Sequence, residues 1–231
     1  MTQKHDQPDH DPVRAEREQS ADQRAAPRFT LLIRAAKLIA DGREYLCIIR
    51  DASATGIKAR LFTPLPEHEE LLIELANGDR YPVRLKWIDE DYAGFQFHQP
   101  IDIDRLIDER SGGMPRRQVR LRIALDAILH SGGEATRIGF QDISQQGACV
   151  ECEKWLLMNE LVRLETGIMP PIYAKVRWRS HPRYGLLFES TFKLDELARI
   201  SAPLQLGQAL RNAMAQPQTM PEAGDEDRKA G

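Results

Sequence analysis

The sequence predicts a mainly β protein with two tandem six-stranded antiparallel barrels, each followed by a helix, between disordered tails. Short apolar or alternating runs, separated by turn residues, occur in two sets of six. The second set repeats the first at a fixed offset: Trp87 and Trp178, like Gly94 and Gly185, are 91 positions apart. A period this long indicates a duplicated domain and not a solenoid of small repeats.

The first set of strands follows a polar N-terminal segment, residues 1–22. This segment has almost no large apolar side chain, so it buries too little surface to offset its ordering entropy and is expected to be disordered. The first barrel is predicted at 23–110, where Asn77-Gly78 between two runs is a strong hairpin signal. Six short strands at this spacing favour a closed barrel, which has no exposed edges. They are expected at 31–39, 45–49, 57–62, 71–75, 81–88 and 93–97.

A short helix over 101–110 is expected to cover one end of the first barrel. The sequence Ser111-Gly112-Gly113 then breaks the chain, which places a linker at 111–115. The second barrel is predicted at 116–200, with strands at 121–129, 135–140, 148–153, 161–165, 172–178 and 184–189.

Apolar side chains at roughly helical spacing continue from Leu194 to Leu210. Pro203 is expected to kink or break this helix. The apolar stripe suits packing on the barrel or, alternatively, a homodimer contact. Residues 201–231 are therefore predicted to form a helical extension and, from about Gln216, a disordered tail.

The composition narrows the classes of function. Hydrophobic residues at 42% and charged residues at 29% are ordinary for a soluble protein, and a net charge of −3 disfavours bulk nucleic-acid binding. No apolar run approaches the roughly 18 residues of a membrane span, and the N-terminal segment lacks the apolar core of a signal peptide. Three cysteines suit a reducing cytoplasm, where we expect them to be buried as small hydrophobes.

An enzyme is not predicted. The sequence has no phosphate-binding Gly-Lys loop, no nucleophile elbow and no paired-His metal motif. We therefore expect no catalytic residue, no metal site and no cofactor.

Two copies of one motif carry the chemistry instead. Each copy has two arginines separated by three residues and, 22 or 23 residues after the second arginine, the pattern Asp-x-Ser-x-x-Gly. The candidate ligand-binding residues are Arg24, Arg28, Asp51, Ser53 and Gly56 in the first copy, and Arg116, Arg117, Arg120, Asp142, Ser144 and Gly147 in the second.

These residue types suit a small ligand that carries both guanine and phosphate. The planar fork of an arginine matches the O6 and N7 edge of guanine or two phosphate oxygens, and its flat face stacks on bases. A carboxylate accepts hydrogen bonds from the other guanine edge, where N1–H and the exocyclic amine are adjacent donors. In the alternative interpretation, the Asp-x-Ser-x-x-Gly pattern is a tight turn. Asp and Ser cap neighbouring amides of this turn, and Gly supplies an unusual backbone angle. The arginines then form only a solvated basic arm.

The tryptophans of the repeat invite a stacking role in ligand binding. However, Trp87 and Trp178 each lie in an alternating strand just before a turn, and large aromatic side chains dominate protein cores. We therefore predict that both pack in the barrel cores.

The two motif copies and the strands that follow them resemble the PilZ domain, a bacterial receptor for cyclic di-GMP. The segments VRLKW (83–87) with GFQF (94–97), and KVRW (175–178) with YGLLF (184–188), look like the last two strands of that fold. The resemblance covers residues 23–108 and 114–200, and it implies that the motif residues bind the nucleotide. The second copy is the closer match, because Ile143 stands where the first copy has Ala52.

The resemblance implies a cytoplasmic, non-enzymatic receptor that converts cyclic di-GMP binding into a change of interdomain arrangement or of protein-partner binding. Because Arg116 and Arg120 follow the linker directly, ligand is expected to order the linker and reorient the first barrel. One alternative is an adaptor that binds proteins but no nucleotide. The other is a small-barrel binder of single-stranded nucleic acid, which the 6% aromatic content and the negative net charge disfavour.

Overall fold

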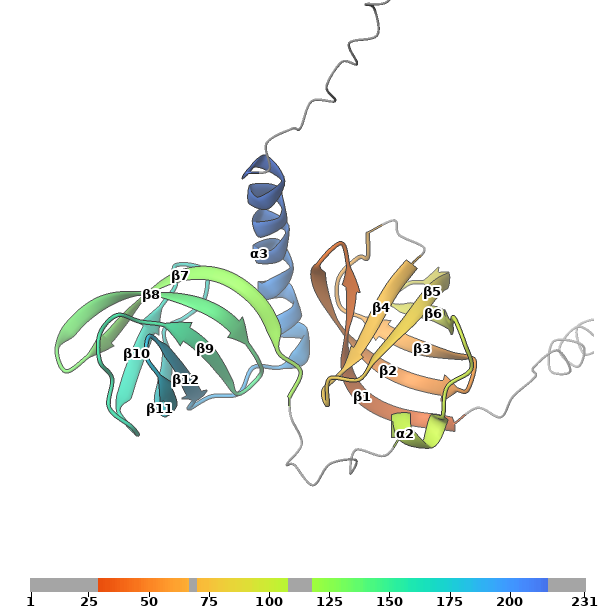
Figure 1. Cartoon of the computed structure of the whole chain (residues 1–231), viewed down its shortest axis with the longest axis horizontal. Coiled ribbons are helices and arrows are strands. Elements are labelled where there is room, and N and C mark those ends of the chain that lie inside the picture. Colours follow the sequence, from red (N-terminus) through yellow and green to blue (C-terminus); the bar gives the residue numbers. More distant parts are fainter. Residues whose placement is uncertain (1–28, 67–69, 108–117, 216–231) are drawn as a thin grey trace, which may run out of the picture.

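The computed structural model describes residues 29–66, 70–107 and 118–215, which form two closed six-stranded antiparallel barrels and two helices (Figure 1). The predicted barrels are thus confirmed. The tails at 1–22 and 216–231 and the linker at 111–115 lie outside the described residues. None of the described helices is long and apolar enough to cross a membrane.

The first barrel closes in the order β1-β2-β3-β6-β5-β4. Alternation along its strands turns side chains such as Leu38, Ile49 and Ile73 into a shared core, where they are fully buried. Its strands are β1 (Phe29–Ala40), β2 (Arg43–Ser53), β3 (Gly56–Leu61), β4 (Glu70–Leu75), β5 (Arg80–Asp89) and β6 (Tyr92–Phe97).

The second barrel has the same topology and closes in the order β10-β11-β12-β9-β8-β7. Its core includes Leu129, Phe140 and Leu164, which are the counterparts of Leu38, Ile49 and Ile73 at the 91-residue offset. Its strands are β7 (Leu121–Ser131), β8 (Glu134–Ile143), β9 (Gly147–Glu151), β10 (Leu161–Glu165), β11 (Ile172–Ser180) and β12 (Arg183–Phe188).

The prediction that the two tryptophans pack in the cores is wrong. The register of β5 against β6 shifts between Leu85 and Trp87, and that of β11 against β12 shifts between Val176 and Trp178. The extra residue of each bulge reverses the alternation, so the following tryptophan points outward. Trp87 and Trp178 are 44% and 41% exposed.

The two helices follow the barrels. Helix α2 (Ile103–Ile107) is shorter than the predicted 101–110, whose last three residues lie outside the described residues. Its Leu106 is buried, and the Leu106 carbonyl accepts a hydrogen bond from the Arg34 guanidinium of β1. Helix α2 therefore covers the first barrel at its β1 side.

Helix α3 (Leu194–Ala215) lies between the two barrels and contacts both β2 and β7 (Figure 1). The expected kink or break at Pro203 does not end the helix, since α3 continues for twelve residues beyond it. Pro203 is on the exposed side, while Leu197 and Ala198 pack in the core of the second barrel. The described start of the apolar stripe thus packs within the chain.

The three cysteines are buried and free, as predicted for small hydrophobic side chains. Burial raises the pKa of the Cys47 thiol to about 12 and also raises the pKa of Cys149 and Cys152. None of the three therefore has the character of a reactive thiolate.

Candidate functional site

The structure brings four predicted site residues of the second barrel together. Arg120 directly precedes β7, and the pairing of β7 with β8 places it beside Asp142, so that Arg120 Nη1 lies 2.6 Å from Asp142 Oδ1. Ser144 follows β8, and both its backbone N–H and its hydroxyl donate to the Gly147 carbonyl, at 2.8 and 3.1 Å. The Arg120–Asp142 ion pair thus stands next to a closed turn.

Gly147 serves a purpose that differs from the expected one. It begins β9 and is not among the glycines with positive φ, so an unusual backbone angle does not explain it. A Cβ at this position would lie 2.2 Å from the Leu186 carbonyl oxygen of β12. Glycine is required because the two strands approach closely. Gly56 of the first barrel has the same role, since its Cβ would lie 2.5 Å from the Phe95 carbonyl oxygen.

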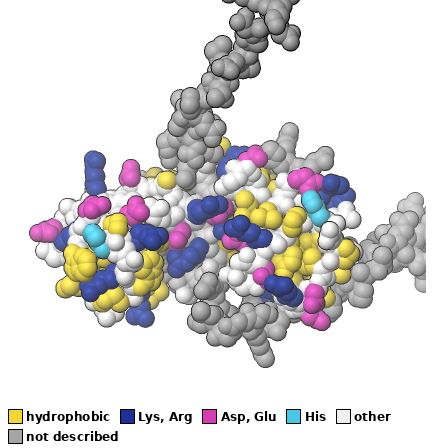
Figure 2. Space-filling view, in the orientation of Figure 1, with side chains coloured by type: hydrophobic (Ala, Val, Ile, Leu, Met, Phe, Trp, Pro, Cys, Tyr) yellow, Lys and Arg dark blue, Asp and Glu magenta, His cyan; other side chains and the backbone are white. Residues whose placement is uncertain are grey.

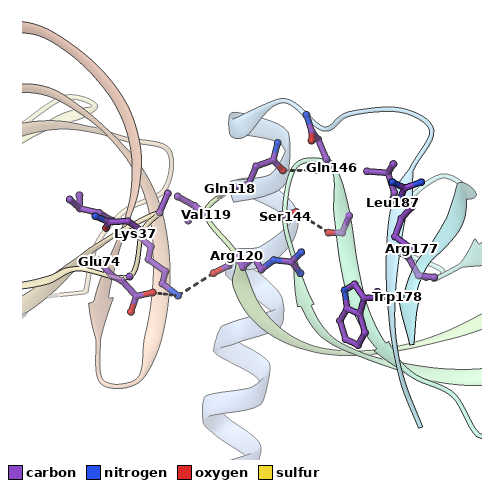
Figure 3. A pocket seen from close by; sticks show the side chains of 17 residues that line it. Lys37, Glu74, Gln118, Val119, Arg120, Ser144, Gln146, Arg177, Trp178 and Leu187 are labelled. Carbon is purple, nitrogen blue, oxygen red and sulfur yellow. Dashed lines mark hydrogen bonds and ion pairs between the residues drawn. The ribbon is translucent and has the colours of Figure 1, made fainter. Parts of the chain in front are cut away.

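A cavity of about 680 Å³ opens beside the Arg120–Asp142 pair, within the range of small-molecule sites. Both barrels line it: Lys37, Glu74 and the Asn77-Gly78 turn of the first barrel face Arg120 and Trp178 of the second (Figure 3). Basic side chains gather on the surface where the barrels meet (Figure 2). Further polar lining comes from Gln118, Gln146, Ser144 and Arg177.

One wall of this cavity is the indole of Trp178, which lies flat on Gly185. A Cβ on Gly185 would fall 1.9 Å from Trp178 Nε1, so only glycine leaves room for the ring. The first barrel repeats the arrangement with Trp87 on Gly94, where the corresponding distance is 2.1 Å. Each tryptophan–glycine pair thus holds an exposed indole ring against the barrel. Both residues recur at the 91-residue offset, and this repeat is the pattern in the sequence that indicates the pair.

A buried ionic network, which sequence reasoning missed, joins the site to the first barrel. Lys37 of β1 is 8% exposed; its Nζ lies 3.0 Å from Glu44 Oε1 and 2.9 Å from Glu74 Oε1. The same ammonium donates to the Arg120 carbonyl at 3.1 Å. In the sequence, this network is indicated only by a lysine within the apolar run 31–39, and that lysine does not reveal a partner in the other barrel.

Glu44 is the centre of this network and is 3% exposed. Besides Lys37, its carboxylate accepts hydrogen bonds from Arg122 of β7, from the backbone N–H at 2.8 Å and from Nε at 2.9 Å. Its own backbone N–H donates to Gln205 of α3. Glu44 therefore connects the two barrels through its carboxylate and connects the first barrel to α3 through its backbone N–H.

Glu74 responds to the same lysine. Burial raises the pKa of the Glu74 carboxyl, but hydrogen bonds from Lys37 and Arg80 outweigh burial, so the pKa lies below its ordinary value. A carboxyl whose pKa is lower in the folded state stabilises the fold fully above its ordinary pKa. This contribution is lost as the pH falls through the lowered value.

The first copy of the motif is built as a capped turn. The Ser53 hydroxyl accepts hydrogen bonds from the Gly56 and Thr55 N–H groups, at 3.1 and 3.3 Å, and donates to the Gly56 carbonyl at 3.2 Å. The adjoining cavity measures about 240 Å³, below the usual range for ligand sites. Asp51 lines it together with Lys58, Lys86 and Trp87.

Four predicted arginines lie outside the described residues: Arg24, Arg28, Arg116 and Arg117. Their roles therefore remain predictions. Arg120 is the one motif arginine within the described part of the chain.

No relative was found among curated proteins. Solved structures that match this chain include PlzA of Borreliella burgdorferi in complex with c-di-GMP (15% identity, 87% of this chain and 98% of that chain, TM-score 0.30). A second is MrkH of K. pneumonia, with 15% identity, coverage of 78% of this chain and 88% of that chain, and a TM-score of 0.30. A third is YcgR of Escherichia coli in complex with c-di-GMP, with 11% identity, coverage of 79% of this chain and 86% of that chain, and a TM-score of 0.30.

At these identities and TM-scores, the family assignment rests on the sequence profile of the PilZ domain. This profile matches twice, over residues 22–109 and 115–202, and together the two matches cover most of the chain. The chain belongs to the PilZ domain family and carries two PilZ domains in tandem.

Proposed function

We propose that this protein is a non-enzymatic, cytoplasmic cyclic di-GMP receptor whose working site is on the second barrel. The observation that carries the proposal is the Arg120–Asp142 pair, with Ser144 and Gly147, at a cavity of about 680 Å³. The first copy adjoins a smaller cavity, of about 240 Å³.

The chemistry of the lining fits the two parts of this ligand. Asp142 is placed to accept hydrogen bonds from the N1–H and exocyclic amine of a guanine. Arg120 and Arg177 supply positive charge for phosphate oxygens or for the O6 and N7 edge. The exposed indole of Trp178 offers a flat wall on which a base stacks.

The proposed mechanism uses the position of the site between the barrels. A ligand in this cavity contacts residues of both barrels. It is expected to draw Arg116, at the end of the linker, onto the face that carries Asp142, and to compete with Asp142 for the Arg120 guanidinium. Because Lys37 of the first barrel holds the Arg120 carbonyl, movement of Arg120 is transmitted to β1. We expect the maximum dimension in small-angle scattering to change at saturating ligand, and an unchanged profile would contradict the mechanism.

Calorimetric titration of the full chain with cyclic di-GMP tests the site assignment. The Arg116→Ala/Arg120→Ala variant is expected to lose binding, because it removes charge-assisted hydrogen bonds worth about 1.5–3 kcal/mol each. The matched variant Arg24→Ala/Arg28→Ala, in the first barrel, is expected to bind like the wild type. Equal losses in both variants would mean two working sites and would contradict the single-site proposal.

The tryptophan wall offers a second matched pair. Gly185→Ala is expected to displace the Trp178 indole. Because one base-stacking contact is then lost, cyclic di-GMP binding is expected to weaken about tenfold or more. Gly94→Ala displaces Trp87 by the same clash in the other barrel and is expected to leave affinity unchanged. Tryptophan fluorescence confirms displacement in each variant, and equal affinities would exclude Trp178 from the site.

The second candidate function is an adaptor that binds a protein partner and no nucleotide. The observation in its favour is that Arg120 and Asp142 already satisfy each other, so the pair also works as a structural link between β7 and β8. The same titration decides between the two functions. If millimolar cyclic di-GMP produced no heat of binding, the receptor function would be excluded and the adaptor function would be favoured.

A further inference from the structure

The two barrels differ sharply in one cross-strand row on their outer faces. In the first barrel, the register places Glu70, Arg84 and Gln96 side by side on β4, β5 and β6. In the second, the counterparts on β10, β11 and β12 are Leu161, Lys175 and Leu187. Each residue pair is 91 positions apart. The Glu and Gln that flank the basic residue in the first barrel are therefore replaced by two leucines in the second, while the central residue stays basic.

Neighbouring positions extend this difference. Leu161 is 60% exposed and Tyr173 of β11 is 56% exposed, while the counterpart of Tyr173 in the first barrel is Pro82. Leu157 and Met158, in the loop before β10, are also exposed. We call Leu157, Met158, Leu161, Tyr173 and Lys175 the apolar outer face. Figure 2 shows apolar side chains gathered on the second barrel, over its lower part, with basic side chains among them.

The first barrel serves as an internal control for this surface. It closes the same sheet with Glu70 and Arg84 in an ion pair, N to O 2.7 Å, so the fold does not require apolar side chains at these positions. Contiguous exposed apolar groups on a soluble protein mark an interaction site. Within the described residues, Lys175 has no acidic partner, so a ligand of this face should bring a carboxylate.

The β5–β6 hairpin of the first barrel carries an exposed apolar side chain next to two carboxylates, which complements the apolar outer face and its Lys175. The β5–β6 hairpin of the first barrel presents Ile88, 51% exposed, followed by Asp89 and Glu90. Neither carboxylate forms an ion pair with a described residue. The counterparts of Ile88, Asp89 and Glu90 in the second barrel are Arg179, Ser180 and His181, so the acidic character is confined to the first barrel's hairpin.

We propose that the apolar outer face binds the β5–β6 hairpin of a second copy of this chain. Ile88 packs against Leu161 and Tyr173, and Asp89 or Glu90 pairs with Lys175. Because every copy carries both surfaces, a two-fold arrangement makes the contact twice. The contact involves neither the Arg120–Asp142 pair nor the cavity, so it does not depend on nucleotide binding.

Sedimentation equilibrium of the full chain without nucleotide, over a range of protein concentrations, tests this proposal. The wild type is expected to self-associate, and association is expected to weaken as salt screens the charges. Leu161→Glu installs the residue that the first barrel uses, so it is compatible with the fold, and it is expected to weaken association at least tenfold. Ile33→Glu is the matched control, since Ile33 is 69% exposed on β1, outside both proposed surfaces, and it is expected to leave association unchanged.

Charge reversal identifies the contact. Lys175→Glu and Glu90→Lys are each expected to weaken association tenfold or more, and the double variant is expected to recover most of the loss. A wild type that stays monomeric at all concentrations would overturn the proposal and assign the face to another protein. Association that Leu161→Glu leaves intact, or a double variant no better than the singles, would overturn it too.

Discussion

Asp142→Asn is expected to lower cyclic di-GMP affinity by about 100-fold or more. An amide presents an N–H₂ donor where the guanine edge has two donors, so one hydrogen bond to the ligand is lost and the other is no longer charge-assisted. Together these losses amount to about 3 kcal/mol or more. Calorimetry of the full chain measures the effect.

The duplication supplies the control for this variant. Asp51→Asn makes the same change at the equivalent position of the first barrel, which adjoins the smaller cavity. We expect it to leave affinity within about twofold of the wild type. Thermal unfolding of both variants verifies that the fold is retained. If Asp51→Asn weakened binding as much as Asp142→Asn, the ligand would have to occupy the first barrel as well.

Glu44→Gln is expected to destabilise the full chain by about 3 kcal/mol. The substitution removes the charge that faces buried Lys37, and it replaces one of the two acceptor oxygens that receive hydrogen bonds from Lys37 and Arg122 with an N–H₂ donor. Removing one partner of a buried ion pair costs about 3–5 kcal/mol. We place Glu44 at the lower end, because Lys37 retains Glu74. Urea denaturation, followed by far-UV circular dichroism, measures the loss.

Glu70→Gln is the control for Glu44→Gln, since it breaks the exposed pair with Arg84. Exposed pairs contribute about 0–1 kcal/mol, so this variant is expected to unfold at nearly the wild-type urea concentration. Equal midpoints for the two variants would show that the buried network does not hold the barrels together. The network also carries the link from Lys37 to the Arg120 carbonyl, so we expect Glu44→Gln to alter the ligand-induced change in scattering.

Local patterns were sufficient to predict the strands and the duplication. The strands are short apolar or alternating runs, and turn residues such as Asn77-Gly78 separate them, so a short window of sequence identifies each element. The second motif was predictable for a similar reason, because Arg120 and Asp142 belong to a pattern with fixed spacing, and antiparallel pairing of β7 with β8 brings them together.

The sequence by itself thus determined the two barrels and their duplication, and it predicted the residues of the candidate site. The tertiary structure alone decided that Trp87 and Trp178 face outward, because one extra residue at a bulge reverses the alternation. It also decided that the cavity lies between the barrels and that Glu44 connects them with α3. The contacts of Glu44 join residues 78 to 161 positions apart, which no local pattern encodes.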